Sequence, residues 1–311
     1  MGLKIFKPVH WLYNLIHYKK LLHNRNAYLK YGVKKPLIGS ISSADFPDRD
    51  SKAWLDTGDS KALAPQHPQF HSFSAEVQSQ LQAWSENGFL VLPDFFSDAV
   101  CNQVNKEIDE LVQNKKLRFK YARKLMFANK KSKTVRDLSE DRRLLNILSF
   151  ILGKELVPFQ TINFLQGSEQ RAHSDSIHMT TYPLGYLIAA WVALEDVHAD
   201  NGPLFYYPGS HKLPFLLNSD YNEGSTLLKL GKHDYNKYED VIEEVLQEKI
   251  FERKEFFASK GDVFIWHANL AHGGSPIINN QLSRKSMVIH YYAKDVIKYH
   301  EITERPSLMN S

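Results

Sequence analysis

Two polar side chains stand two positions apart in RAHSDSIHMTTYP (residues 171–183), a segment that otherwise reads as a β-strand. In a strand, residues i and i+2 point to the same face, so we expect His173 and Asp175 to project side by side, with Ser174 facing away. An imidazole and a carboxylate held together can bind a transition metal. Taken alone, the two are better explained as a hydrogen-bonded surface pair, so a metal site requires a third ligand.

The segment GDVFIWHANLAHGGSP (residues 261–276) offers two candidates for that ligand, His267 and His272. A Gly-Gly pair follows His272 and lets the backbone approach a neighbour closely. A His-x-Asp pair with a second histidine far downstream matches the facial triad of non-haem Fe(II) oxygenases, which leaves three coordination positions for a bidentate co-substrate and O₂. The predicted metal ligands are His173, Asp175 and His272.

An arginine supports this interpretation. Arg284 lies twelve residues after His272 and heads the strand-like RKSMVIHYY. A planar, bidentate guanidinium suits the distal carboxylate of 2-oxoglutarate, and Ser286, which has the same facing in a strand, can add a hydroxyl. Considered without the triad, Arg284 fits a surface ion pair better.

The chain takes on β character from about residue 155. Short β-branched or aromatic runs are bounded by Gly, Pro or Asn: VPFQTINFL, IHMTTYP, YLIAAWVAL, LFYYPGS, DVFIWHA and SMVIHYY. Such an array, joined by turn-rich links, predicts a sandwich or jelly roll. Residues 215–256 interrupt it with a polar segment that contains the helix-like EDVIEEVLQEK, which we expect to form a lid or wall. Residues 36–80 read as irregular.

The N-terminal segment is basic and amphipathic. Residues 1–44 hold eight Lys or Arg and no acid, within a chain of net charge +4. A helical period there predicts an apolar stripe, formed by Trp11, Leu12, Leu15, Ile16, Tyr18 and Leu22. The segment could make peripheral contact with an anionic membrane through residues 1–35, or it could be a helix that packs against its own domain.

A second basic run holds ten Lys or Arg and no acid between Lys115 and Arg136. No recognised nucleic-acid motif accompanies it, so we interpret it as a solvated face, or as a patch for an anionic substrate, and expect no nucleic-acid partner. The single cysteine, Cys101, excludes an internal disulfide and favours a reducing compartment. Neither a membrane span nor the apolar core of a secretion signal is visible. We therefore expect a cytoplasmic protein, free or associated with the cytoplasmic face of a membrane.

Several local motifs together resemble the phytanoyl-CoA dioxygenase family of Fe(II)/2-oxoglutarate oxygenases. They are HSDSIHM, WVALEDVHADNGPLFYYPGSHKLP, KGDVFIWHANLAHGGSP and SRKS, and the resemblance runs from about Trp84 to Tyr292. It implies a mainly β fold with flanking α-helices, built on a double-stranded β-helix (a cupin-like jelly roll). We accordingly expect residues 1–80 to be a basic helix with an irregular extension, and residues 81–311 to be the oxygenase domain.

The resemblance also implies roles for individual residues. Iron is expected on His173, Asp175 and His272. Arg284 should hold the distal carboxylate of 2-oxoglutarate, in a pocket lined by Trp191, Ser286 and either Thr161 or Asn163. His267, close before the distal ligand, should support the site from outside the ligand set, or else be a core histidine. The implied cofactors are Fe(II) and 2-oxoglutarate, with O₂ as oxidant.

The expected reaction is hydroxylation, because halogenating relatives replace the carboxylate ligand with a small residue and Asp175 is present here. The substrate class is a small or lipid-like molecule, and the basic run at 115–136 mildly favours an anionic one. A zinc-dependent hydrolase could use the same His/Asp/His set but gives no reason for Arg284. A non-catalytic cupin-like binding protein remains a further alternative. Nothing in the sequence indicates an oligomeric state.

Overall fold

The structure is a computed structural model that describes residues 6–46, 48, 50–121, 123–221, 225–231 and 235–309. Its helices are α1 (Lys7–Ile16), α2 (Arg25–Lys30), α3 (Ser60–Leu63), α4 (Ala75–Gln82), α5 (Trp84–Asn87), α6 (Asp98–Gln113), α7 (Lys133–Ser139), α8 (Arg142–Leu152), α9 (Asn218–Tyr221) and α10 (Tyr235–Glu248). Its strands are β1 (Phe89–Leu92), β2 (Phe119–Lys120), β3 (Lys124–Met126), β4 (Leu156–Phe164), β5 (Thr180–Tyr182), β6 (Leu187–Ala193), β7 (Leu204–Tyr206), β8 (Lys254–Phe256), β9 (Val263–His267), β10 (His272–Gly274), β11 (Ser286–Ala293), β12 (Ile297–His300) and β13 (Arg305–Pro306).

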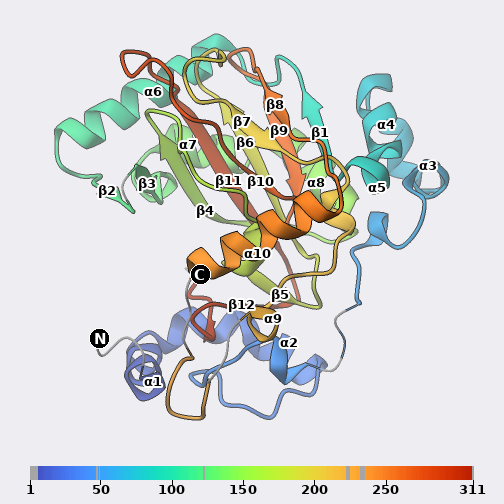
Figure 1. Cartoon of the computed structure of the whole chain (residues 1–311), viewed down its shortest axis with the longest axis vertical. Helices are drawn as coiled ribbons and strands as arrows, with labels where there is room; N and C mark the ends of the chain where they lie inside the picture. The colour runs from blue at the N-terminus through green and yellow to red at the C-terminus, as the bar shows by residue number, and fades with distance from the viewer. Residues whose placement is uncertain are drawn as a thin grey trace.

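Two antiparallel sheets form the centre of the molecule (Figure 1). The larger sheet has the strand order β1-β9-β6-β11-β4-β3-β2, and the smaller has the order β10-β7-β8. A third small sheet, β13-β12-β5, lies towards the N-terminal helices. The arrangement, with helices around it, is the double-stranded β-helix that the sequence motifs implied.

The larger sheet is covered on both faces. Along β6, Ile188, Ala190 and Val192 belong to a core cluster that also contains the buried side chains of α6, α7 and α8. The alternate residues Ala189 and Trp191 face the inside of the barrel, together with side chains from the smaller sheet. Because both faces are buried, β6 reads in the sequence as a continuous apolar run rather than as an alternating one.

Helix α8 is fixed at both ends by local chemistry. The Asp141 carboxylate accepts hydrogen bonds from the backbone amides of Arg143 and Leu144 at the helix N-terminus. Gly153 ends the helix with φ of 64°, and a Cβ there would lie 2.6 Å from the Trp54 side chain. This contact joins α8 to residues 54–56, so the N-terminal extension packs closely on the helical layer.

In the two regions without a recognisable sequence pattern, the described residues include several helices and a strand. Helix α4 spans the expected domain boundary at residue 80, and the Gln80 side chain bonds both backbone polar groups of Val91 on β1. The insertion at 215–256 carries α9, α10 and β8, and α10 crosses in front of the sheets (Figure 1). Among the described residues, no helix combines the length and the apolar character that a membrane crossing requires.

Candidate metal centre

The backbone brings His173 and Asp175 together in a different way from the one expected. His173 forms an isolated bridge with His272, in which each amide donates to the other carbonyl at 3.0 Å. Asp175 begins a short 3₁₀ helix (Asp175–Ile177), and the predicted strand is reduced to β5 at residues 180–182. The strand alternation was therefore wrong, because the chain turns at Asp175, yet the turn aims the carboxylate at the two imidazoles.

Hydrogen bonds fix the tautomer of both histidines. His173 Nδ1 donates to the carbonyl oxygen of Arg171 at 2.9 Å, and His272 Nδ1 donates to that of Leu270, also at 2.9 Å. Because each Nδ1 carries the proton, each Nε2 keeps its lone pair for a metal. His272 Nε2 lies 3.8 Å from Asp175 Oδ1, and the donor atoms of all three residues lie within 4.8 Å of one another. This donor set fits a divalent transition metal.

The Gly-Gly pair after His272 is required by a close backbone contact. A Cβ on Gly273 would lie 2.5 Å from the carbonyl oxygen of Gln170, and one on Gly274 would lie 2.9 Å from the amide nitrogen of Glu169. Both contacts involve backbone atoms, which cannot move aside. The pair thus lets β10 lie against the segment that leads into His173.

The charge states of the three residues are those that a metal needs. Burial lowers the pKa of both imidazoles, so His173 and His272 are neutral near pH 7. Burial alone would raise the pKa of Asp175, but the neighbouring His290 and His272 hold it well below its usual range. Two neutral imidazoles and one ionised carboxylate therefore stand ready without the loss of protons that metal binding otherwise demands.

Two residues that were not predicted position the Asp175 carboxylate. Trp266 Nε1 donates to Asp175 Oδ2 at 2.8 Å, and His290 Nε2 lies 3.3 Å from the same oxygen. His290 could have been found from the sequence. It follows Arg284 and Ser286 by an even number of positions, and residues spaced in this way along a strand point to the same face.

The basic run at 115–136 supplies a cation to the centre. Lys124 Nζ donates to Gln170 Oε1 at 3.0 Å, and the amide nitrogen of Gln170 lies 3.1 Å from His173 Nε2. Burial lowers the pKa of Lys124, and the charge of Asp175 opposes that shift. The prediction of a solvated face therefore does not hold for Lys124.

Arg284 is buried without a counter-ion. Its side chain is 2% exposed, Nη1 donates to Ser286 Oγ at 2.9 Å, and the guanidinium lies 5.7 Å from the ring centroid of Trp191. Nε has no hydrogen-bond partner, and no carboxylate within the described ranges pairs with the group. Burial lowers its pKa to about 10, so it remains a cation at neutral pH. A buried, uncompensated guanidinium fits a carboxylate of a bound co-substrate, because burying a lone charge is otherwise costly.

The structure does not bring Thr161 and Asn163 to this pocket. In the register of β4 with β11, Asn163 pairs with Met287 and Thr161 with Ile289, residues of the helix-covered face. Directly paired residues share a face, so both side chains point away from the barrel interior. Thr161 Oγ1 is instead hydrogen-bonded to Asn129. The interior face of β4 carries the alternate residues 160, 162 and 164.

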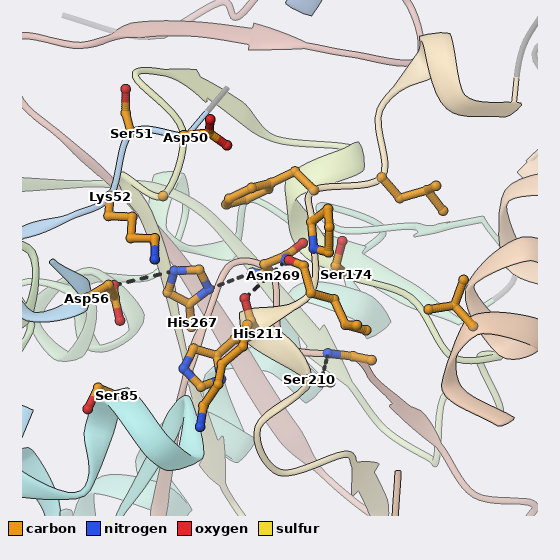
Figure 2. Close-up of a pocket in the computed structure, with 18 of the residues that line it drawn as sticks. Asp50, Ser51, Lys52, Asp56, Ser85, Ser174, Ser210, His211, His267 and Asn269 are labelled. Atoms are coloured by element: carbon orange, nitrogen blue, oxygen red, sulfur yellow. Dashed lines mark hydrogen bonds and ion pairs between the residues drawn. The ribbon is translucent and has the colours of Figure 1, made fainter. Parts of the chain in front are cut away.

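His267 also lies outside the pocket, on the opposite face of β9 from Trp266. Its Nε2 lies 3.5 Å from Asp56 Oδ2, and its Nδ1 accepts from the Asn269 amide at 3.0 Å. These groups line a separate cavity of about 1060 Å³ (Figure 2), which His211 also lines. Burial lowers the pKa of His267 to about 4. The interpretation as a supporting residue of the metal ligands is therefore wrong, and the core-histidine alternative describes it better.

A double-stranded β-helix with a His/Asp/His centre and an interior arginine defines the class of non-haem iron, 2-oxoglutarate-dependent dioxygenases. The comparison with protein families agrees: the model of the phytanoyl-CoA dioxygenase (PhyH) family matches residues 84–286. The chain belongs to this family. It is an oxidoreductase that uses Fe(II), 2-oxoglutarate and O₂.

Individual relatives are distant. The peroxisomal phytanoyl-CoA dioxygenase of Homo sapiens is 24% identical over 297 residues, which cover 85% of this chain and 77% of that protein. The carbocyclase SnoK from nogalamycin biosynthesis has a TM-score of 0.59 at 17% identity, over 77% of this chain and 89% of its own. EctD from S. alaskensis, solved with 2-oxoglutarate and 5-hydroxyectoine, has a TM-score of 0.55 at 21% identity, over 82% and 86%. At these identities the solved structures establish the fold.

Proposed function

We propose that this dioxygenase hydroxylates an unactivated C–H bond of a small or lipid-like, anionic substrate. The observation that carries the proposal is the buried Arg284, which has no counter-ion of its own and lies on the same barrel-facing side as the complete triad. A zinc hydrolase would have no use for a buried guanidinium beside its metal. A binding protein would have no need of three ligands with matched protonation states.

Different residues of the chain would bind the metal and orient its carboxylate ligand. His173, Asp175 and His272 would hold the metal, and Trp266 and His290 would keep the carboxylate ligand in orientation. When bound, Fe(II) and 2-oxoglutarate supply the oxidising chemistry, in which O₂ and 2-oxoglutarate yield succinate, CO₂ and a hydroxyl group in place of a substrate hydrogen.

Two further residues bind the co-substrate. Arg284 and the hydroxyl of Ser286 would hold its distal carboxylate, and the ring of Trp191 would shield that contact from water. The burial of the metal ligands, each no more than 6% exposed, keeps bulk water from the reacting atoms.

The preference for an anionic substrate rests on Lys124. It is a second cation near the metal centre, because Lys124 Nζ donates to Gln170 Oε1 and Gln170 Nε2 lies 3.1 Å from His173 Nε2. Positive charge near the metal centre therefore favours a negative group on the substrate, in addition to the 2-oxoglutarate carboxylate that Arg284 would bind. A lipid-like acid or an acidic metabolite meets this requirement.

The test has two parts. Protein reconstituted anaerobically with Fe(II) should convert 2-oxoglutarate to succinate only after O₂ is admitted, and His173→Ala should abolish this while His267→Ala retains it. An untargeted metabolite and lipid comparison of a His173→Ala strain with the wild type should then show one substrate accumulating and its product, heavier by one oxygen, missing. Succinate formation without O₂ dependence, or equal loss in both variants, would overturn the proposal.

A further inference from the structure

The N-terminal helix is docked with its polar side inward. In α1 the buried residues are Lys7, His10 and Asn14. Lys7 Nζ forms an ion pair with Glu304 Oε2 at 2.5 Å, and the Asn14 amide donates to the carbonyl oxygen of Ile38 at 2.9 Å. This is the reverse of the usual burial of an amphipathic helix, whose apolar stripe faces the core.

The apolar stripe of the same segment is consequently left on the outside. Ile16 is 72% exposed and Leu12 is 61% exposed. The other exposed large apolar side chains of residues 6–29 are Phe6, Val9, Tyr13, Leu15, Tyr18, Leu22 and Leu29. Single exposed apolar residues are ordinary on a protein surface, but a continuous group of this size marks a contact site.

A second segment, more than 200 residues away in the sequence, extends this surface. Leu227 is 80% exposed and Leu228 is exposed beside it. The Leu228 carbonyl accepts from the Lys7 amide at 3.0 Å, and Lys229 forms a bridge with Phe6 at the start of α1. Figure 1 shows residues 225–231 running beside the N-terminal helices. We name the exposed apolar residues of 6–29 together with Leu227 and Leu228 the N-terminal apolar surface.

Positive charge borders the N-terminal apolar surface. The exposed basic side chains of residues 6–35 are Lys19, Lys20, Arg25, Lys30, Lys34 and Lys35, and the first acid in the sequence is Asp45, which pairs with Lys35.

We infer that the N-terminal apolar surface docks on an anionic lipid membrane. A helix with exposed leucine, isoleucine and tyrosine side chains and flanking lysines lies in the plane of the lipid interface, with its apolar face among the acyl chains and its cations at the headgroups. A second copy of the chain would bring two basic surfaces together, whereas anionic lipid neutralises them. Leu227 and Leu228 belong to the 215–256 insertion, whose α10 bonds Ser174 through the Tyr238 hydroxyl. The membrane would therefore contact the insertion whose helix α10 is bonded to Ser174, the residue between the predicted ligands His173 and Asp175.

Sedimentation with vesicles tests this inference directly. The full chain should bind vesicles of phosphatidylcholine with 30% phosphatidylserine and should not bind phosphatidylcholine alone. Lys19→Gln/Lys20→Gln should lower the binding constant roughly thirtyfold, at about 1 kcal/mol for each of the two basic residues near the surface. Leu12→Asp/Ile16→Asp and Leu227→Asp/Leu228→Asp should each reduce it further.

A matched control separates a local effect from added charge. Ile278 is 70% exposed and lies in another part of the surface, so Ile278→Asp should leave vesicle binding unchanged. Unaltered thermal unfolding and Fe(II) binding in every variant would show that the fold is retained. If Leu12→Asp/Ile16→Asp binds as well as Ile278→Asp does, the inference fails. It also fails if the wild type ignores anionic vesicles but self-associates in ultracentrifugation through Leu12 and Ile16, because the surface then joins two copies of the chain.

Discussion

His290 Nε2 lies 3.3 Å from Asp175 Oδ2, and neither nitrogen of the His290 ring has another partner among the described residues. The same carboxylate oxygen accepts the indole proton of Trp266, while Asp175 Oδ1 faces His272 Nε2. One oxygen of the ligand is therefore used for orientation and the other is available to the metal. Outer contacts of this kind set how well a ligand holds its ion.

The first prediction concerns the contact between His290 and Asp175 Oδ2. Replacing His290 by Ala should weaken Fe(II) binding roughly 10- to 100-fold, because the ligand carboxylate loses a partner that fixes its direction. His290→Gln, which keeps a donor near that position, should lose less. Anaerobic Fe(II) titration measures both. Equal affinity in wild type and His290→Ala would show that Trp266 alone positions Asp175.

The second prediction concerns the choice between two histidines. One Fe(II) per chain should bind to the wild type, and His272→Ala should bind far less, because the triad loses a direct ligand. His267→Ala provides the matched control, since His267 lies on the other face of the sheet beside Asp56. Metal analysis after gel filtration gives the ratio. The reverse pattern would mean that His267 is the distal ligand.

The third prediction separates co-substrate binding from structure. Arg284→Leu should raise the 2-oxoglutarate concentration needed for half-maximal succinate formation roughly 10- to 100-fold, because a charge-assisted hydrogen bond is lost. Iron binding should persist. The cofactor-free variant should unfold at no lower temperature than wild type, because the mutation removes a buried charge that has no counter-ion. A large loss of stability instead would make Arg284 a structural residue.

Much of the metal centre was predictable because short motifs carry it. His173, Asp175 and His272 lie next to turns and glycines whose local chemistry is visible in the sequence, and Arg284 with Ser286 needs only the alternation of one strand. The same alternation, carried two steps further, reaches His290. The structure brings these three side chains together although the predicted strand geometry was wrong, since Asp175 begins a 3₁₀ helix.

The sequence-based predictions failed where the outcome depended on which face of a strand or helix is turned towards the interior. Thr161 lies next to Ile162 in β4, and only the pairing with β11 determines which of the two enters the barrel. A one-residue change of register would exchange them, and no local pattern fixes it in a strand buried on both sides. The inverted burial of α1 has the same origin, because its partners, Glu304 and Ile38, are remote in sequence.

The fourth prediction uses the pH dependence of stability. Burial raises the pKa of Asp56 to about 7 from the ordinary value of 3.8. Between these values the unfolded chain releases a proton that the folded chain retains, so this group lowers stability as the pH rises from 4 to 7. Burial lowers the pKa of His267 from 6.5 to about 4. Between these values the unfolded chain binds a proton that the folded chain does not, so this group raises stability as the pH rises from 4 to 6.5.

Asp56→Asn should remove the loss of stability that the raised pKa of Asp56 causes as the pH rises. It should also keep an acceptor for Trp84 Nε1, which donates to Asp56 Oδ1 at 2.8 Å. At pH 8 the variant should be more stable than wild type, by an amount on the order of 3 kcal/mol, and at pH 4 the two should agree. Urea unfolding at both pH values measures the difference. Asp137→Asn, at an exposed ion pair, is the control and should show no such trend. A constant difference between Asp56→Asn and wild type would mean that Asp56 is ionised throughout.

The final prediction tests Asp175 through a halide. Asp175→Gly removes the carboxylate ligand and opens a coordination position for chloride, and it also leaves the Trp266 indole without its acceptor. Iron affinity should fall, because the charge that neutralises the metal is lost and the donor set shrinks to two imidazoles. Hydroxylation should be lost and chlorination should reach trace levels at most, because a halogenating site also needs surrounding groups that hold chloride, and a glycine at position 175 supplies none. Mass spectrometry of products in saturating chloride, with iron measured on the same sample, decides the matter, and hydroxylation at the wild-type rate in Asp175→Gly would remove Asp175 from the ligand set.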